Sequence, residues 1–159
     1  MARTKRTIVG KGYLNIREQA VSTAVAVTPG ALMERVGGAA TVRVHSTEGG
    51  IVEKLFALED AFQGKGINDD YGAAGVPVML WSPVPGERVY ALTDQTSAVS
   101  IAIGDFLVSH GDGTLTPLTV TSAAVTEFPN SIVGVALEAG VAGTDFRVLA
   151  NSLTFKKIK

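Results

Sequence analysis

Short apolar or alternating segments follow one another along most of the chain and are separated by turn signals. Pairs such as Pro29-Gly30 and Pro85-Gly86 recur at short intervals, and glycine and proline at these positions favour tight turns. Residues 41–45 alternate strictly between apolar and polar, as a strand with one exposed face does. A single helical turn is expected over residues 58–62. The remaining segments predict about ten short strands, over residues 25–28, 31–34, 41–45, 76–81, 88–92, 99–103, 106–109, 114–118, 132–137 and 146–149.

Closely spaced strands of this kind are typical of an all-β protein, here a compact β-barrel or sandwich with one short helix. The 159 residues suffice for one domain, and the 18 glycines together with frequent Val, Ile and Thr favour strands over helices. Residues 1–22 lack the strand-turn rhythm, although residues 7–9 and 13–16 are able to pair with an exposed sheet edge. We therefore expect an N-terminal arm over residues 1–22 and a β-rich body over residues 23–159.

Charge is distributed unevenly, although the net charge is only −1. Residues 1–18 carry five basic side chains against one acidic, the last four residues carry three lysines, and the middle of the chain is acidic. A basic arm on an acidic body suits a segment that meets an acidic surface, either nucleic acid or another protein. The alternative is that both ends fold back onto the acidic body.

The composition removes several kinds of chemistry. The absence of Cys excludes disulfides, thiolate zinc sites and a cysteine nucleophile, and two His make a multi-histidine metal centre unexpected. Gly10-Lys11-Gly12 and Gly64-Lys65-Gly66 lack the spacing of a phosphate-binding loop and are interpreted as turns. No long apolar segment predicts a leader or a membrane span, so a soluble cytosolic product without cofactor or metal is expected. Solvated turn carboxylates are expected at Asp60, Asp69, Asp70, Asp105 and Asp112.

Catalytic residues are weakly indicated. Ser109, His110 and Asp112 are adjacent, whereas triad members normally come from separate segments, and no Gly-x-Ser-x-Gly elbow is present. No enzymatic activity is expected; a small hydrolase that uses Asp105, His110 or Asp112 is the alternative. Trp81, the single Trp, ends an apolar run and suits core or subunit-interface packing, with a carbohydrate platform as the alternative.

The segment over residues 57–71 resembles very closely a segment of the small head decoration, or capsid cement, proteins of tailed bacteriophages. Its surroundings over residues 27–34, 75–78, 85–91, 103–109 and 113–115 follow the order that the family shows. The resemblance spans roughly residues 25–150, and the block from Leu58 to Tyr71 is its specific part.

This resemblance implies a homotrimer on the outer surface of the virion head, made in the host cytoplasm, at three-fold and quasi-three-fold positions. It implies that the major capsid (coat) protein is the partner, that the shell is stabilised by bridging coat subunits, and that the protein has no enzymatic activity and binds neither nucleic acid nor membrane. In related proteins an N-terminal arm adds a strand to the coat protein.

We therefore predict that the arm docks on an exposed coat-protein edge as an extra strand. Apolar anchors are expected at Ile8, Tyr13 and Ile16, cationic contacts to coat carboxylates at Arg3, Lys5 and Arg6, and an oligomer-interface contact at Trp81. A nucleic-acid-binding β module and a carbohydrate-binding or adhesion domain remain the alternatives.

Overall fold

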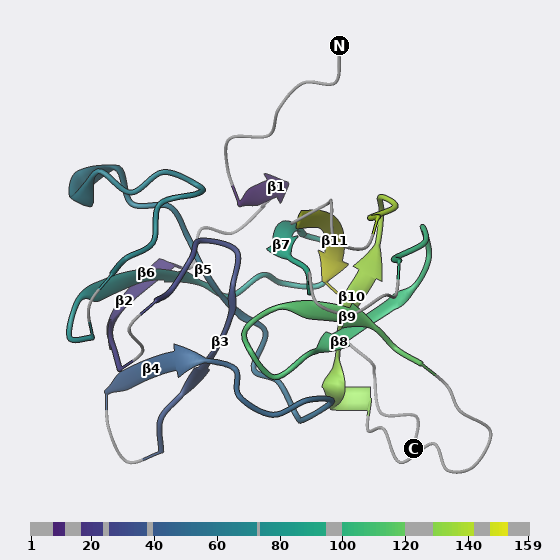
Figure 1. Ribbon diagram of the computed structural model, residues 1–159, viewed down its shortest axis with the longest axis horizontal. Coiled ribbons are helices and arrows are strands. Elements are labelled where there is room, and N and C mark those ends of the chain that lie inside the picture. Colours follow the sequence, from purple (N-terminus) through teal and green to yellow (C-terminus); the bar gives the residue numbers. More distant parts are fainter. Residues whose placement is uncertain are drawn as a thin grey trace.

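The chain folds into a closed five-stranded barrel packed against a six-stranded sheet (Figure 1). The computed structural model describes residues 8–11, 17–23, 26–37, 40–72, 74–94, 100–119, 129–141 and 147–152. In this part of the chain the regular elements are strands and two short 3-10 helices, η1 (Ala61–Gln63) and η2 (Pro129–Ser131). The prediction of an all-β fold with barrel architecture is confirmed.

The barrel is closed by hydrogen bonding between its first and last strands. Its strand order is β2 (Arg17–Ser22), β4 (Thr41–Val44), β3 (Leu32–Arg35), β5 (Leu55–Ala57) and β6 (Pro77–Trp81). The β2–β4 pair is parallel and the other four pairs are antiparallel. Closure leaves the barrel without free edges on which another chain could add a strand.

The second sheet is antiparallel and curls back on itself. Its order is β1 (Val9–Lys11), β7 (Arg88–Leu92), β11 (Arg147–Ser152), β10 (Ile132–Ala136), β8 (Phe106–Ser109) and β9 (Leu115–Pro117). Thr93, directly after β7, forms a parallel bridge to Leu115 of β9, and the Asp94 amide donates to the Leu115 carbonyl at 3.0 Å. The end of β7 therefore meets the opposite edge of its own sheet.

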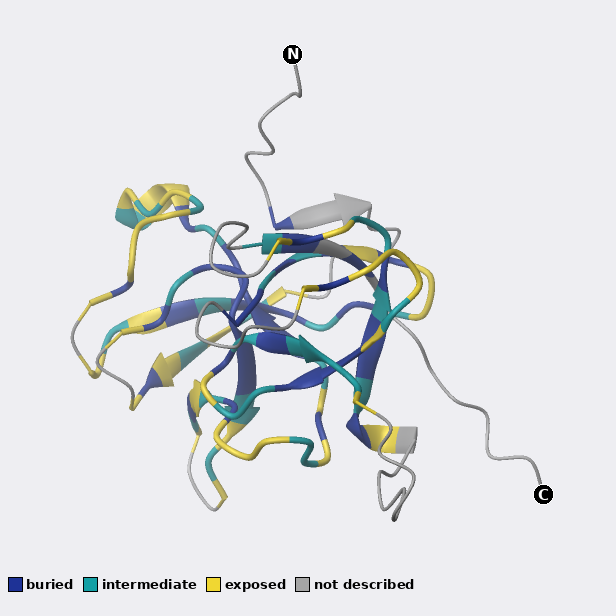
Figure 2. Ribbon diagram, turned by 45° about the vertical axis from the view of Figure 1, so that its right-hand side comes forward, coloured by how far each residue is buried: buried dark blue, intermediate teal, exposed yellow. Residues whose placement is uncertain are grey.

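Two apolar clusters explain why the sequences of β5 and β6 are almost continuously hydrophobic. Leu55 and Ala57 belong to the cluster inside the barrel, whereas Phe56 and Trp81 belong to the cluster between barrel and sheet. Because β5 and the Trp81 end of β6 are covered on both faces, both alternating sets of side chains are apolar there. Figure 2 shows the buried segments concentrated along this junction.

Eight of the predicted strands are present, as β3, β4 and β6 to β11, with ends within a few residues of the expected ones. Residues 26–28 are not in a strand, and residues 100–103 contribute only the isolated bridge between Ile101 and Gly140. The expected helical turn appears as η1, shifted towards Gln63. None of the helices among the described residues has the length and apolarity needed to cross a membrane.

Candidate interaction surface

Ile8 marks the point at which the N-terminal segment joins the body. Its side chain is fully buried in the cluster between barrel and sheet, and a Cβ at Gly30 would lie 3.2 Å from its Cδ1. The Ile8 amide donates to Glu59 Oε2 at 3.1 Å, and its carbonyl accepts from the Tyr90 amide at 2.8 Å. Ile8 therefore anchors the chain to its own core, which corrects the expectation that it anchors the chain to a capsid.

The expected arm is shorter than residues 1–22. Strand β1 pairs with β7 of the same chain, with Val9 opposite Val89, and β2 completes the barrel. Residues 8–11 and 17–22 thus belong to the body, because their backbone groups are used in its own ladders. The other predicted contact residues lie outside the described residues: Arg3, Lys5, Arg6, Tyr13 and Ile16.

The segment that carries the family resemblance forms a loop that projects from the barrel between β5 and β6, here named the tip loop (residues 58–71; Figure 1, upper left). Asp60 organises it: its carboxylate accepts from the Phe62 amide at 2.9 Å and from Gln63 Nε2 at 2.8 Å. Backbone hydrogen bonds between Asp60 and Lys65 of 2.9 and 2.8 Å close the base of the turn, and Gly64 supplies the left-handed residue with φ of 66°. The tip therefore has a defined conformation.

Two side chains tie the tip loop to the body. Arg147 of β11 donates to the carbonyls of Pro29 and Ile67, and burial lowers the pKa of its guanidinium, an effect that Tyr90 and Glu59 oppose. At the far end of the loop, the Tyr71 hydroxyl accepts from the Met79 amide of β6 at 3.4 Å and donates to the Leu58 carbonyl at 2.6 Å. Both ends of the loop are thus fixed by buried polar contacts, whose loss leaves unsatisfied groups.

Replacing Tyr71 with Phe is expected to reduce the loss of folding stability that the protein shows at alkaline pH. Burial, with Asp60 and Glu59 nearby, raises the pKa of Tyr71 from 10.0 to about 12. The folded protein then holds a proton that the unfolded chain releases, so this contribution is full below pH 10 and is lost between pH 10 and 12. Chemical denaturation at both pH values should show wild type losing about 1–2 kcal/mol more than Tyr71→Phe across this window. Equal losses in the two proteins would contradict the assignment.

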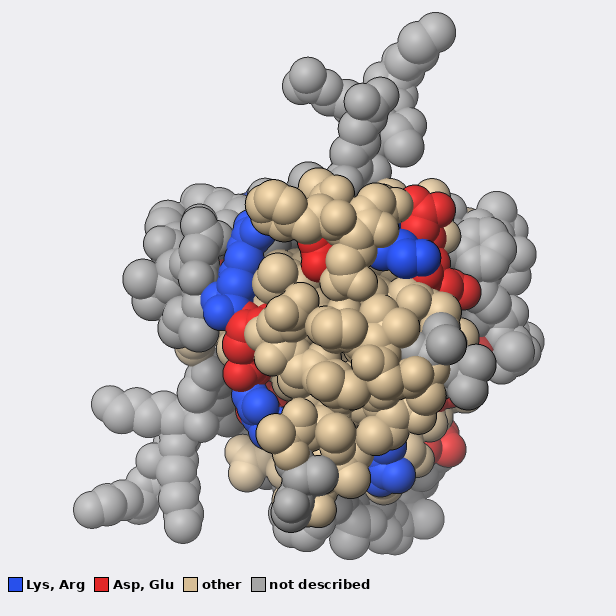
Figure 3. Space-filling view, turned by 90° about the vertical axis from the view of Figure 1, so that its left-hand side faces the viewer, with Lys and Arg blue, Asp and Glu red and all other residues tan. Residues whose placement is uncertain are grey.

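Phe62, at the tip of this loop, is 101% exposed. The loop is joined to the barrel face beneath it, because Gln63 Nε2 donates to the Pro77 carbonyl at 2.9 Å. On that face the exposed Val21 of β2 lies opposite Pro77 and the exposed Gln19 opposite Met79. Figure 3, which views this side, shows mainly uncharged side chains in the middle and charged groups around the margin. Sequence reasoning placed residues 58–62 in a helical turn and missed Phe62 as a surface residue; its isolated position beside a capping Asp was the available signal.

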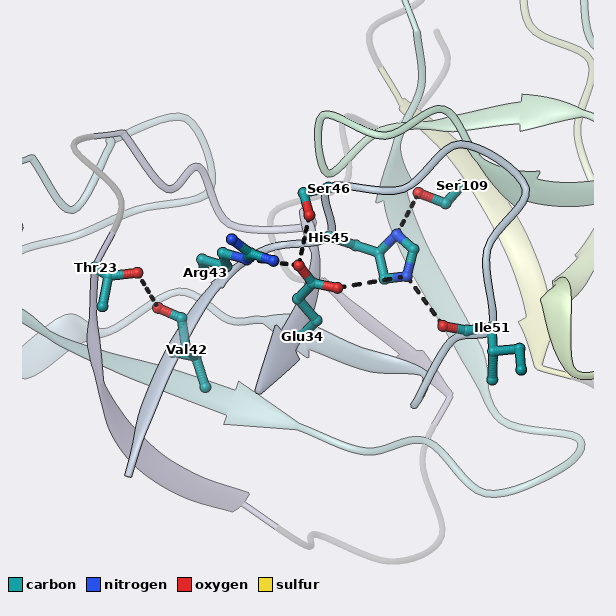
Figure 4. A network of polar contacts seen from close by, with 8 residues as sticks. All are labelled: Thr23, Glu34, Val42, Arg43, His45, Ser46, Ile51 and Ser109. Atoms are coloured by element: carbon teal, nitrogen blue, oxygen red, sulfur yellow. Dashed lines mark hydrogen bonds and ion pairs between the residues drawn. The ribbon is translucent and has the colours of Figure 1, made fainter. Parts of the chain in front are cut away.

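Ser109, one of the residues that suggested catalysis, forms with His45 a structural link between barrel and sheet (Figure 4). His45 Nδ1 lies 2.8 Å from Ser109 Oγ, and His45 Nε2 lies 3.1 Å from the Ile51 carbonyl and 3.8 Å from Glu34 Oε2. Ser109 Oγ also accepts from the Gly111 amide at 3.1 Å. Ser109 and His45 are both fully buried, so a substrate has no access to the hydroxyl in this arrangement.

Replacing Ser109 with Ala is expected to lower the free energy of unfolding by about 1–3 kcal/mol, because His45 and the Gly111 amide lose a buried partner. Ser46→Ala is the matched control, since its hydroxyl donates to Glu34 Oε1 at the exposed surface. Urea denaturation of both variants measures the difference. A loss at Ser109 no larger than that at Ser46 would show that the link does not stabilise the junction.

His110 makes one of the two contacts that the triad requires, the contact to Asp112, while its other contact is to Asp94 and not to Ser109. Its Nε2 lies 3.6 Å from Asp94 Oδ2 and its Nδ1 lies 3.4 Å from Asp112 Oδ2. Burial raises and hydrogen bonds from Thr114 lower the pKa of Asp112, with a net downward shift. The three side chains bring possible metal ligand atoms within 4.8 Å of one another, yet Asp112 already accepts from the Thr114 amide at 2.9 Å. Ser109 therefore contacts His45, whereas His110 contacts Asp94 and Asp112. Ser109, His110 and Asp112 do not form a catalytic triad in this structure.

The carboxylates expected in turns do cap turns. Asp69 accepts from the Gly66 amide at 2.9 Å and Asp105 from the Ala102 amide at 2.7 Å. Asp70 instead makes a long-range contact, because it accepts from the Thr28 hydroxyl. Asp60 departs from the expectation of a solvated group, because it is buried under the tip loop that it organises.

Trp81 is fully buried within the chain and lies opposite Phe56 in the β5–β6 pair. The expectation of an oligomer-interface contact through this side chain is corrected: the sheet covers the face of β6 that carries Trp81, so the indole has no surface for a neighbouring subunit. For the same reason it has no face on which a sugar ring can stack.

No family model matches the chain, and none of the curated proteins matches it. A search of solved structures finds similarity to the crystal structure of the N base of head fiber gp8.5 from bacteriophage phi29, with a TM-score of 0.53 and 16% identity. The similarity covers 89% of this chain and 100% of that chain. At this identity the comparison establishes a shared fold, and the two-part all-β architecture extends over nearly the whole of both chains.

Proposed function

We propose that this chain is a structural protein of a tailed-bacteriophage head that decorates the outer surface of the capsid by binding the major coat protein. The single observation that carries the proposal is the fold shared with the N base of a phage head fiber over almost the full length of both chains. The resemblance of residues 57–71 to capsid cement proteins supports the same role, and this block forms the organised tip loop.

The finer proposal is a homotrimer at three-fold and quasi-three-fold positions that bridges coat subunits. Three copies bound as a set gain avidity of roughly 10² to 10⁴ over a single copy when all three contacts are reachable together. Such a trimer resists shell expansion because several contacts must break at once. The role requires no catalysis, in keeping with the buried state of Ser109 and His45.

The described surface offers less support for the alternatives. Two exposed arginines of the barrel are already paired with carboxylates, Arg35 with Glu53 at 2.8 Å and Arg43 with Glu34 at 2.6 Å. Pairing of this kind reduces the positive surface available for nucleic-acid phosphates. The burial of Trp81 removes this side chain as the platform for the carbohydrate-binding alternative.

The experiment that tests the proposal mixes the purified chain with empty heads assembled from the major coat protein encoded in the same genome. Co-sedimentation followed by cryo-electron microscopy is expected to show three copies around three-fold positions on the outside of the shell. A chain that stays in the supernatant at every concentration, or that shifts labelled DNA in a salt-dependent manner instead, would overturn the proposal.

A further inference from the structure

We propose that Phe62 is the anchor of the capsid contact and inserts into an apolar pocket of the coat protein that is bordered by carboxylates. This inference rests on the proposed function and adds the contacting residue and the chemistry of the surface that it meets. It assigns to the tip loop a role separate from that of the N-terminal segment.

The Phe62 side chain is not packed into the core of the body. Its side chain is fully exposed, whereas the remainder of its loop is held by hydrogen bonds to Asp60, Arg147 and Tyr71. An aromatic side chain on an ordered loop loses little conformational freedom on binding. Because it is fully exposed in the free protein, all of the apolar area that it buries is buried in the complex. Aromatic residues in such positions are frequent binding hot spots.

The basic residues that precede Ile8 indicate the charge of the surface that Phe62 would contact. The Ile8 amide is bound to Glu59, the residue directly before the Asp60 that caps η1. The sequence before Ile8, which carries Arg3, Lys5 and Arg6, therefore joins the described structure at the foot of the tip loop. A surface that receives both must combine an apolar pocket with acidic groups.

The same arrangement argues against a second copy of this chain as the occupant. A symmetric contact through Phe62 would bring together the two points at which the basic N-terminal segments join the body at Ile8, and like charges at an interface oppose association. The middle of the barrel face next to the loop is mainly uncharged, and the charged groups on this side lie around its margin (Figure 3). The coat protein is therefore the occupant that we commit to.

The test compares Phe62→Ala with wild type for binding to empty heads of the same coat protein, with Ile103→Ala as control because Ile103 is also an exposed apolar residue, at 70%. Phe62→Ala is expected to weaken binding by about 30-fold or more, while Ile103→Ala stays within about twofold and both variants keep the wild-type melting temperature. Phe62→Leu should recover part of the affinity. Because the charges are untouched, the salt dependence of Phe62→Ala binding should equal that of wild type.

The other possible results distinguish the proposal that Phe62 is the anchor from the proposal that the chain binds the capsid. Wild-type affinity in Phe62→Ala would overturn the anchor while leaving capsid binding intact, whereas failure of the wild-type chain to bind heads would end the proposed function and the anchor with it. A change in the oligomeric state of free Phe62→Ala in analytical ultracentrifugation would show that Phe62 contacts a second copy, which also overturns the inference.

Discussion

Replacing Phe56 with Ala is expected to lower the free energy of unfolding by about 3–5 kcal/mol, because the substitution leaves a cavity in a well-packed core. Phe56 is 1% exposed and lies between Leu32 and Trp81 of the neighbouring strands, in the cluster that joins barrel and sheet. The surrounding β-strands are fixed by their ladders on both sides, so they cannot collapse into the space. Urea or guanidinium denaturation monitored by Trp81 fluorescence measures the loss.

The matched control is the same substitution at Phe62, which is expected to change the free energy of unfolding by less than about 0.5 kcal/mol. The two variants remove the same atoms, and only the burial of the side chain differs. A loss at Phe56 below about 1 kcal/mol, or a loss at Phe62 of similar size to that at Phe56, would contradict the placement of the core. The comparison also shows that the Phe62 variant used in binding experiments remains folded.

The strands that sequence reasoning found are those whose pattern is set by local burial. Strand β7 alternates between core and surface, and turns with Gly or Pro separate most of the others. Strand β2 was missed because its inward residues Glu18, Ala20 and Ser22 are small or polar, which hides the alternation. Strand β5 was missed because three residues covered on both faces show no period at all. Both depend on partners far away in sequence.

The surface was predicted less well than the fold, for a physical reason. Ile8 and Trp81 are apolar residues, and the sequence does not show whether such a residue is buried within its own chain or against a partner protein. The structure separates the two cases by placing a sheet over Trp81 and a glycine beside Ile8. The reverse holds for Phe62, an aromatic residue that is exposed on the loop capped by Asp60.

Deleting residues 2–7 is expected to weaken binding to empty heads by about 10² to 10⁴ if three copies bind as a set, with no change in melting temperature. The deletion stops before Ile8, so the buried side chain and the β1–β7 ladder are retained. Fully extended, these residues reach at most about 25 Å from Ile8, enough to contact the coat surface beside the tip loop. Binding that survives the deletion unchanged would leave the N-terminal segment without a role in attachment.

The charges of this segment are tested separately by changing Arg3, Lys5 and Arg6 together to Glu. Association with heads should then slow most at low ionic strength and approach the wild-type rate in high salt, because screening shortens the reach of the charges to about 10 Å at 0.1 M. The matched control reverses Lys156, Lys157 and Lys159, an equal change in net charge at the other end of the chain. Equal slowing in both variants would mean that overall charge alone governs association; slowing confined to the N-terminal variant means that the coat carboxylates meet the chain beside the tip loop.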